Sequence, residues 1–166
     1  MEKCPHCAGR LAPSRQRQAH RISGRSFTVT IGASACQKCE MVLLSARSVE
    51  RAHLEIASEL ALYGPLGGEA FRFIRKTLGL SAVAIAGLLD VTPETISRWE
   101  NGQRPLDRGA WLTVGTLSLE RAGRSTDTMA RINLLRVAST VKHGPLKIDA
   151  SRDSGVRRSR LKAAKA

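Results

Sequence analysis

The chain has 166 residues and a formal net charge of +13, with 27 Lys and Arg against 14 Asp and Glu. No apolar run approaches the roughly 18 residues of a membrane-spanning helix, which argues against an integral membrane protein, whereas the basic excess favours a polyanionic partner such as nucleic acid. The excess lies at the two ends, because residues 1–45 and 145–166 each carry a net charge of +5.

Four cysteines form two Cys-x-x-Cys pairs, Cys4 with Cys7 and Cys36 with Cys39. The tight turn of such a pair points both sulfurs to one side, and two pairs complete the tetrahedral shell that zinc prefers. So short a segment has too small a core to fold alone, and zinc supplies about 10 kcal/mol or more of folding free energy in zinc-finger peptides. The pattern predicts one structural Zn²⁺ on these four sulfurs, with His6 facing solvent.

Three other uses of the cysteines fit less well. No apolar leader follows Met1, so we expect the chain to stay in a reducing cytoplasm, where disulfides are rare. A thiol oxidoreductase carries its Cys-x-x-Cys after a strand of a βαβ unit, and only three residues precede Cys4. A zinc deaminase needs a His-x-Glu upstream of Pro-Cys-x-x-Cys, but His53-Leu54-Glu55 lies downstream and Ala35 replaces the proline.

Catalysis is not expected. Four thiolates close the zinc shell and leave no position for an activated water. Paired carboxylates or a Ser/His/Asp set cannot be assembled from this sequence. We therefore expect neither an enzyme nor a small-molecule substrate.

The first 64 residues predict a small β domain and a connecting helix. Residues 26–31 alternate polar and apolar side chains, as a half-buried strand does, and 41–44 predict a second strand, so residues 1–45 are expected to form a zinc-binding β-ribbon. Apolar residues then recur at helical spacing over 46–63, and Arg51 is placed to pair with Glu55 one turn later. Glycine and proline at 64–68 end this helix and form a hinge.

Short helices follow from Glu69. The buried stripe of a first helix consists of Phe71, Ile74 and Leu78, and Gly79 ends it. Ser81 caps a second helix that runs to Leu89, in which the small Ala86 allows a close crossing with the next helix, as a helix-turn-helix requires.

The third helix carries the candidate recognition surface. Thr92 is a good N-cap, Pro93 suits the first helical position, and Gly102 ends the helix. Ile96 and Trp99 are expected to face the core. The outward side chains, placed to enter a major groove, are those of Glu94, Thr95, Ser97 and Arg98.

Three further expectations concern the C-terminal part. Trp111 and its apolar neighbours predict a fourth helix, and 127–141 predict a fifth, with Met129 and Ile132 facing inward. These helices complete a helix-turn-helix domain over 65–144. The basic segment 145–166 is expected to be a disordered tail that either reaches DNA phosphates or only solubilises the chain.

The stretch Leu78-Gly79-Leu80-Ser81 followed by Ile96-Ser97-Arg98-Trp99-Glu100-Asn101-Gly102 resembles XRE-type (Cro/repressor-like) helix-turn-helix domains. With two Cys-x-x-Cys pairs upstream, residues 1–140 resemble the MqsA antitoxins with their YgiT-type zinc finger. The resemblance implies a mainly α protein with a small β zinc ribbon, in which a Cys₄ zinc domain precedes a five-helix XRE-type domain.

The resemblance also assigns roles to individual residues. Arg98 matches the base-reading arginine of the recognition helix, with a phosphate clamp as its alternative role, and Arg75 with Glu100 matches an internal ion pair of XRE domains. Ala82 and Glu94 depart from the family, which often has a DNA-contacting glutamine and a base-reading asparagine there, so the operator sequence does not carry over. The full set of candidate DNA-binding residues is Ser81, Thr92, Glu94, Thr95, Ser97, Arg98, Asn101 and Arg104.

Two functions remain open at this stage. In the first, the chain is a cytoplasmic, homodimeric repressor on double-stranded DNA and the antitoxin of a toxin–antitoxin pair, whose zinc-containing half binds an mRNA-cleaving ribonuclease. In the second, it is a stand-alone zinc-ribbon/helix-turn-helix transcription factor with no toxin. The net charge of +5 on residues 1–45 favours the second somewhat.

Overall fold

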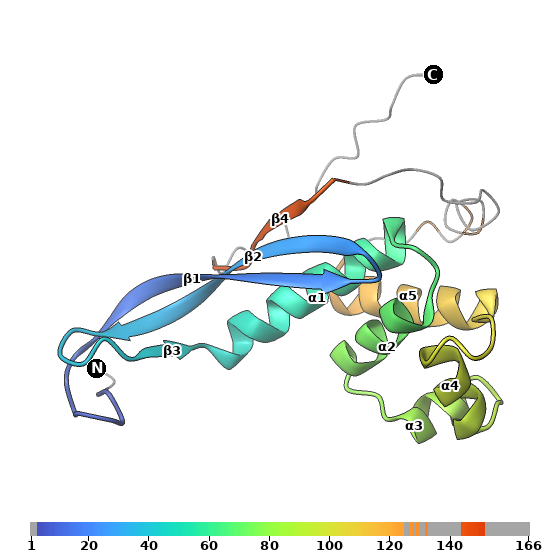
Figure 1. The fold of residues 1–166 in the computed structure, drawn as a ribbon, viewed down its shortest axis with the longest axis horizontal. Coiled ribbons are helices and arrows are strands. Elements are labelled where there is room, and N and C mark those ends of the chain that lie inside the picture. The colour runs from blue at the N-terminus through green and yellow to red at the C-terminus, as the bar shows by residue number, and fades with distance from the viewer. Residues whose placement is uncertain (1–2, 125–126, 128, 130–131, 133–143, 152–166) are drawn as a thin grey trace, which may run out of the picture.

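The computed structural model describes residues 3–124, 127, 129, 132 and 144–151. In this described part, a long β-hairpin and two short strands form a sheet that covers one side of a central helix, and four further helices lie toward the end of the molecule away from the first described residues (Figure 1). The elements in chain order are β1 Leu11–Ile22, β2 Arg25–Cys36, β3 Val42–Leu44, α1 Ala46–Tyr63, α2 Gly68–Thr77, α3 Ala82–Leu88, α4 Pro93–Glu100, α5 Arg108–Arg121 and β4 Leu146–Asp149.

The hairpin is longer than the sequence indicates. Strand β2 contains the predicted strand 26–31 and buries Phe27, Val29 and Ile31 on one face. Strand β1 was not predicted because its sequence is mostly polar, yet it pairs with β2 along its full length of 12 residues. Ser23 and Gly24 join the strands with φ of 49° and 77°, and two positive φ angles are typical of a tight hairpin turn.

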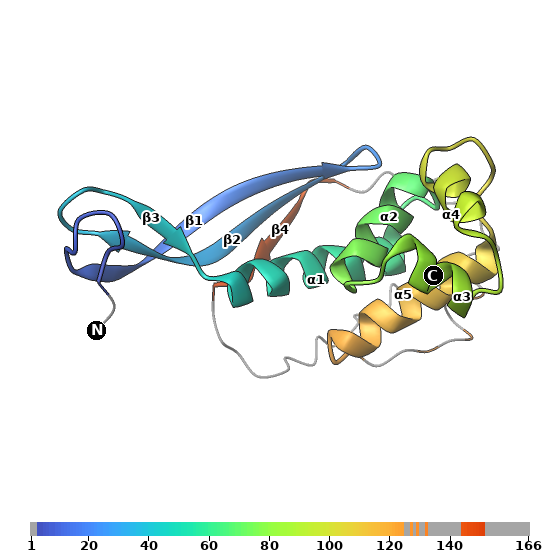
Figure 2. The same cartoon turned by 90° about the horizontal axis from the view of Figure 1, so that it is seen from below.

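Helix α1 has the predicted boundaries and lies between the sheet and α5 (Figure 2). The hydroxyl of Ser45 caps it by accepting from the Ser48 N–H at 3.4 Å. The helix packs against the sheet and against α2 and α5, and its buried residues Ala52, Ile56 and Leu60 belong to the hydrophobic core. No helix in the described part of the chain is long and apolar enough to cross a membrane.

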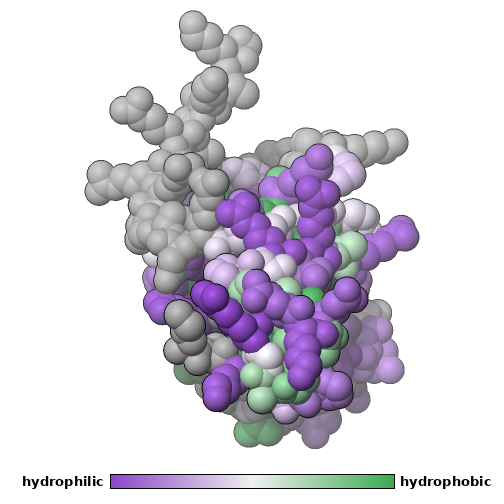
Figure 3. Space-filling view, turned by 90° about the vertical axis from the view of Figure 1, so that its left-hand side faces the viewer, coloured by the Kyte–Doolittle hydropathy of each residue, from purple (hydrophilic) through white to green (hydrophobic). Residues whose placement is uncertain are grey.

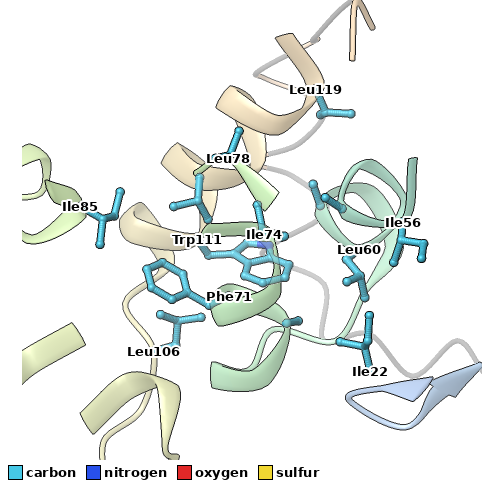
Figure 4. Close-up of a cluster of buried hydrophobic side chains, with 14 of the residues drawn as sticks. Ile22, Ile56, Leu60, Phe71, Ile74, Leu78, Ile85, Leu106, Trp111 and Leu119 are labelled. Carbon is cyan, nitrogen blue, oxygen red and sulfur yellow. The ribbon is translucent and has the colours of Figure 1, made fainter. Parts of the chain in front are cut away.

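Helices α2 to α5 pack around Trp111 and Phe71 (Figure 4). The ring of Phe71 also meets Trp99 edge-on, with centroids 6.1 Å apart, so Trp99 is a core residue as expected. At the hairpin tip, Ile22 points toward α1 and belongs to the same buried cluster. The hydrophobic core therefore runs without interruption from the hairpin through α1 into the helices.

The C-terminal segment differs from expectation. Residues 146–149, predicted to be disordered, form β4, which pairs in parallel with β2 from Phe27 to Thr30. The prediction was wrong because the alternating Leu146, Ile148 and Ala150 find an apolar sheet face that local composition does not reveal. The strand thus returns the end of the chain to the hairpin.

The predicted fifth helix mostly lies outside the described residues. Met129 and Ile132 are helical but exposed, contrary to the expectation that they face inward. The elements bounded within the described residues are therefore α1, the helices α2 to α5 and a small sheet.

Candidate metal centre and nucleic-acid interface

Two turns of the same construction carry the cysteines. The Cys4 N–H donates to the Gly9 carbonyl at 2.9 Å, and the Cys36 N–H donates to the Met41 carbonyl at 2.8 Å. The residue after each pair has a left-handed backbone, with φ of 55° at Ala8 and 57° at Glu40. The two turns therefore present their sulfurs in equivalent ways.

Pairing of β1 with β2 brings these turns together at one end of the sheet. All four sulfurs, those of Cys4, Cys7, Cys36 and Cys39, lie within 4.8 Å of one another. The Sγ atoms of Cys4 and Cys39 are 3.7 Å apart, and those of Cys7 and Cys36 are 3.4 Å apart. A tetrahedral ion with Zn–S bonds of about 2.3 Å has sulfurs about 3.8 Å apart, so the cluster fits such an ion.

The backbone turn favours the thiolate at Cys36, whereas at Cys7 the Gly9 N–H lowers the pKa but hydrogen bonds with the neighbouring thiols outweigh it and raise the pKa to about 12. The backbone N–H groups of Lys38 and Cys39 lower the pKa of Cys36 to about 6, and the Lys38 N–H lies 3.4 Å from the Cys36 Sγ. A side chain at Gly9 would place its Cβ 3.0 Å from that sulfur, which explains the glycine. His6 is exposed and lies outside the cluster. Four sulfur ligands complete a tetrahedral shell, so the site is suited to a structural metal.

Helices α3 and α4 form the helix-turn-helix. The Ser81 hydroxyl accepts from the Ala84 N–H at 3.0 Å at the start of α3, and the Thr92 hydroxyl accepts from the Thr95 N–H at 3.3 Å at the start of α4. The turn between them has Asp90 at φ 52°. Ala86, 2% exposed, lies in the buried cluster that also holds Ile85 and Ile96.

A buried ion pair ties α2 to the end of α4. The Arg75 Nε lies 2.6 Å from Glu100 Oε1, and its Nη2 lies 3.0 Å from Oε2. Both side chains are 8% exposed, and Arg75 also donates to the Leu80 carbonyl at 2.6 Å. The arginine therefore links the recognition helix to α2 and to the chain before α3.

The candidate DNA-binding residues lie in α4 and at its two ends, apart from Ser81 at the start of α3. Seven are exposed and Thr95 is half-buried. Several have local partners as well, because Ser81 caps α3, Thr92 caps α4 and bonds to Thr95, and the Asn101 amide donates to the Ser97 hydroxyl at 3.3 Å.

Glu94 and Arg98 lie one turn apart on the outer face of α4. The backbone N–H of Glu94 itself, the Thr92 hydroxyl and the charge of Arg98 lower the pKa of the Glu94 carboxyl. The carboxylate is therefore ionised at the positive end of the helix, and the exposed Arg98 guanidinium lies a turn further along.

The comparison with known families concerns this half of the chain. Residues 68–116 match the family model of a helix-turn-helix domain. The match begins at the first residue of α2 and ends within α5, so it includes the α3–α4 pair and the Arg75–Glu100 ion pair. No curated protein matches the chain.

Sequence reasoning missed two groups of charged residues. Arg124 reaches α1, where its Nη2 lies 2.5 Å from Glu55 and its Nη1 lies 3.0 Å from Glu59, so Glu55 binds an arginine that is distant in sequence. The second group consists of the exposed arginines within β1. A run of alternating arginines without an acidic residue in 11–36 is a signal that could have identified the second group.

Proposed function

We propose that this protein is a sequence-specific transcriptional repressor that reads double-stranded operator DNA with α4. The observation that carries the proposal is the set of exposed polar side chains on capped, core-anchored helices within the segment that matches a helix-turn-helix family. Arg98 is its base reader, because an arginine that binds both O6 and N7 of guanine is the commonest specific contact in a major groove. Arg104 contacts phosphate, and Glu94 accepts from a cytosine amino group.

Recognition in this proposal is by a homodimer, because a single helix-turn-helix covers little DNA and a two-fold partner adds affinity and fixes the spacing of half-sites. The metal is one Zn²⁺, and its role is structural because the four thiolates leave no open position. The protein has no catalytic role and acts in the cytoplasm, at the nucleoid when bound to DNA.

Selection from a pool of randomised duplexes tests this function. The purified zinc-loaded chain is expected to enrich a two-fold symmetric sequence with half-sites about 10 base pairs apart, or a multiple of that spacing. Enrichment of no sequence, at salt concentrations where non-specific binding is weak, would refute the proposal.

The finer proposal is that the repressor is an MqsA-type antitoxin whose zinc-containing half binds a toxin ribonuclease. Its support is the resemblance in the order of the Cys₄ cluster, the single connecting helix and the helix-turn-helix. A pull-down from native cells with nuclease added tests it. A stoichiometric small protein that is lost when residues 1–64 are deleted would support the antitoxin, whereas contacts that disappear with nuclease would leave the stand-alone regulator.

A further inference from the structure

The outer face of the hairpin has a charge distribution unlike that of the helices. Residues 11–36 contain four arginines and no acidic residue. Arg25 is half-buried over the ring of Phe27, but Arg15, Arg17 and Arg21 are exposed on one face of β1. Because side chains alternate along a strand, these three form a row on the face that points away from the core.

Polar side chains continue this face across the sheet. Arg17 lies opposite Thr30, and Arg21 lies opposite Ser26. On the far side of β2, the exposed Lys147 of β4 lies opposite Thr28. We call these residues of β1, β2 and β4 the hairpin outer face. Viewed from the end that carries the cysteine turns, the molecule shows mainly hydrophilic side chains (Figure 3).

Carboxylates pair with several arginines of the helical part of the molecule but, among the described residues, with none of this row. Arg75 binds Glu100, Arg121 binds Glu50, and Arg124 binds Glu55 and Glu59. Within the described part of the chain, the arginines of the row have no carboxylate within ion-pair distance, and Asp149, at the edge of the face, accepts from Ser151. The row is thus an uncompensated line of positive charge.

Protection of the edge strand β1 against pairing with other chains does not by itself explain why the hairpin has arginines and no acidic residue. Charged side chains on an exposed edge strand prevent pairing with other chains, but a mixture of Glu and Lys serves that purpose equally well. A row of arginines with hydroxyl groups on the neighbouring strand and a side-chain repeat of about 6.8 Å is instead suited to a regular polyanion.

We infer that the hairpin outer face binds the phosphate backbone of duplex DNA beside the operator that α4 reads. This inference rests on the proposed function and extends it to a second, sequence-independent contact. The hairpin tip is fixed to the helices, since the Ser23 N–H donates to Glu69 of α2 at 2.7 Å. From there the strands extend about 40 Å, the length of about 12 base pairs of duplex.

Salt dependence of DNA binding by the full-length zinc-loaded chain tests the inference. Two operator duplexes are compared, one that ends at the half-sites and one that extends about 15 base pairs beyond each. The long duplex is expected to bind more tightly, with a steeper dependence of affinity on salt. The double variant R15Q/R17Q should lose most of the additional affinity for the long duplex. Its slope of log affinity against log salt should be smaller by up to about 1.8, because each phosphate contact contributes about 0.9.

Two further variants make the result specific. R47Q/K76Q removes the same charge from exposed positions on α1 and α2 and should change the slope for the long duplex by clearly less. R15K/R17K keeps the charge and should retain the slope. R15Q/R17Q must have the same zinc content and thermal transition as the unaltered chain. We expect this result because both positions are exposed.

Three outcomes separate the inference from the proposed function. Failure of the unaltered chain to bind any duplex specifically would overturn both. Specific binding with equal slopes for R15Q/R17Q and the unaltered chain would overturn the inference alone. Loss of a co-purifying protein from R15Q/R17Q, with DNA binding intact, would also overturn it and would assign the face to a protein partner.

Discussion

The two ends of the molecule hold their cationic side chains in opposite ways. Toward the helix-turn-helix, Arg75 is buried against Glu100, and an apolar core continues around it. Along the hairpin that leads to the cysteine cluster, the exposed arginines of β1 have neighbouring hydroxyls instead of carboxylates, and at its end the four sulfurs lie within 4.8 Å of one another. Arginine therefore stabilises the fold at one end and adds net positive charge at the other. Its role depends on whether a carboxylate or a hydroxyl group lies beside it.

The largest expected effect is loss of the metal. Replacing Cys36 by Ser should abolish stoichiometric zinc binding and remove about 10 kcal/mol or more of local stabilisation. Hydrogen exchange is expected to show lost protection in residues 3–10 and 36–45, while the hairpin tip, which packs on α1, and the helices α2 to α5 keep theirs.

Exposed His6, in the first turn, provides the matched control. Replacing His6 by Ser should leave zinc content and exchange unchanged. Loss of protection throughout α2 to α5 in the Cys36→Ser variant would contradict the contrast between a metal-held end and a core-held end.

The buried ion pair gives the next largest effect. Replacing Arg75 by Ala leaves Glu100 buried without its partner, which should lower the free energy of unfolding by about 3–5 kcal/mol. Urea denaturation measures this change. Arg72, half-exposed at 3.7 Å from the same carboxylate, is the control, and its replacement by Ala should cost less than about 1 kcal/mol. Equal losses at the two positions would contradict the role of Arg75.

Close packing of α2 on α4 predicts a third effect. A Cβ on Gly68 would clash with the Trp99 carbonyl oxygen, so replacing Gly68 by Ala should cost about 1–3 kcal/mol. Gly87, in α3, has open space around it, and the same change there should stabilise by about 0.4–1 kcal/mol. Thermal unfolding of the pair tests the packing, and destabilisation of equal size at both positions would contradict it.

The smallest effect concerns two histidines between the hairpin and the helices. The rings of His20 and His53 lie edge-to-face 5.5 Å apart, and His53 also meets Phe73 at 5.7 Å. Burial lowers the pKa of both histidines below 6.5, and the charge of His53 lowers the pKa of His20 further. The unfolded chain therefore takes up protons first as pH falls through about 6.5, and stability is lost toward lower pH.

Denaturation of the His53→Gln variant at about pH 7 and about pH 5 measures the contribution of this histidine to the loss of stability in acid. The cysteine thiolates are unchanged in the variant, so their contribution is the same in both proteins. The variant should lose less stability on acidification than the unaltered chain does. The same substitution at exposed His6 is the control and should leave the pH dependence unchanged. An identical pH dependence for His53→Gln and the unaltered chain would show that the pair does not titrate with folding.

Local signals in the sequence predicted most of the helices and the spacing of the cysteines. The N-caps Ser81 and Thr92, and the periodic stripe of α1, act within one or two turns, so they can be read from a short window. Strand β1 and strand β4 depend on pairing with β2, which is a non-local contact, and a polar or short segment carries little evidence of it. The partners of Arg124 lie more than 60 residues away, so no local pattern could reveal them.

The central claim is that Arg98 reads a base. Fluorescence anisotropy measures the affinity for two duplexes, the selected operator and a duplex in which its guanines are replaced. The proteins compared are the unaltered chain, Arg98→Ala and Arg104→Ala. We predict that Arg98→Ala loses about 1–3 kcal/mol of discrimination between the duplexes while remaining folded and dimeric, whereas Arg104→Ala weakens binding to both equally. Full discrimination retained by Arg98→Ala would contradict the claim.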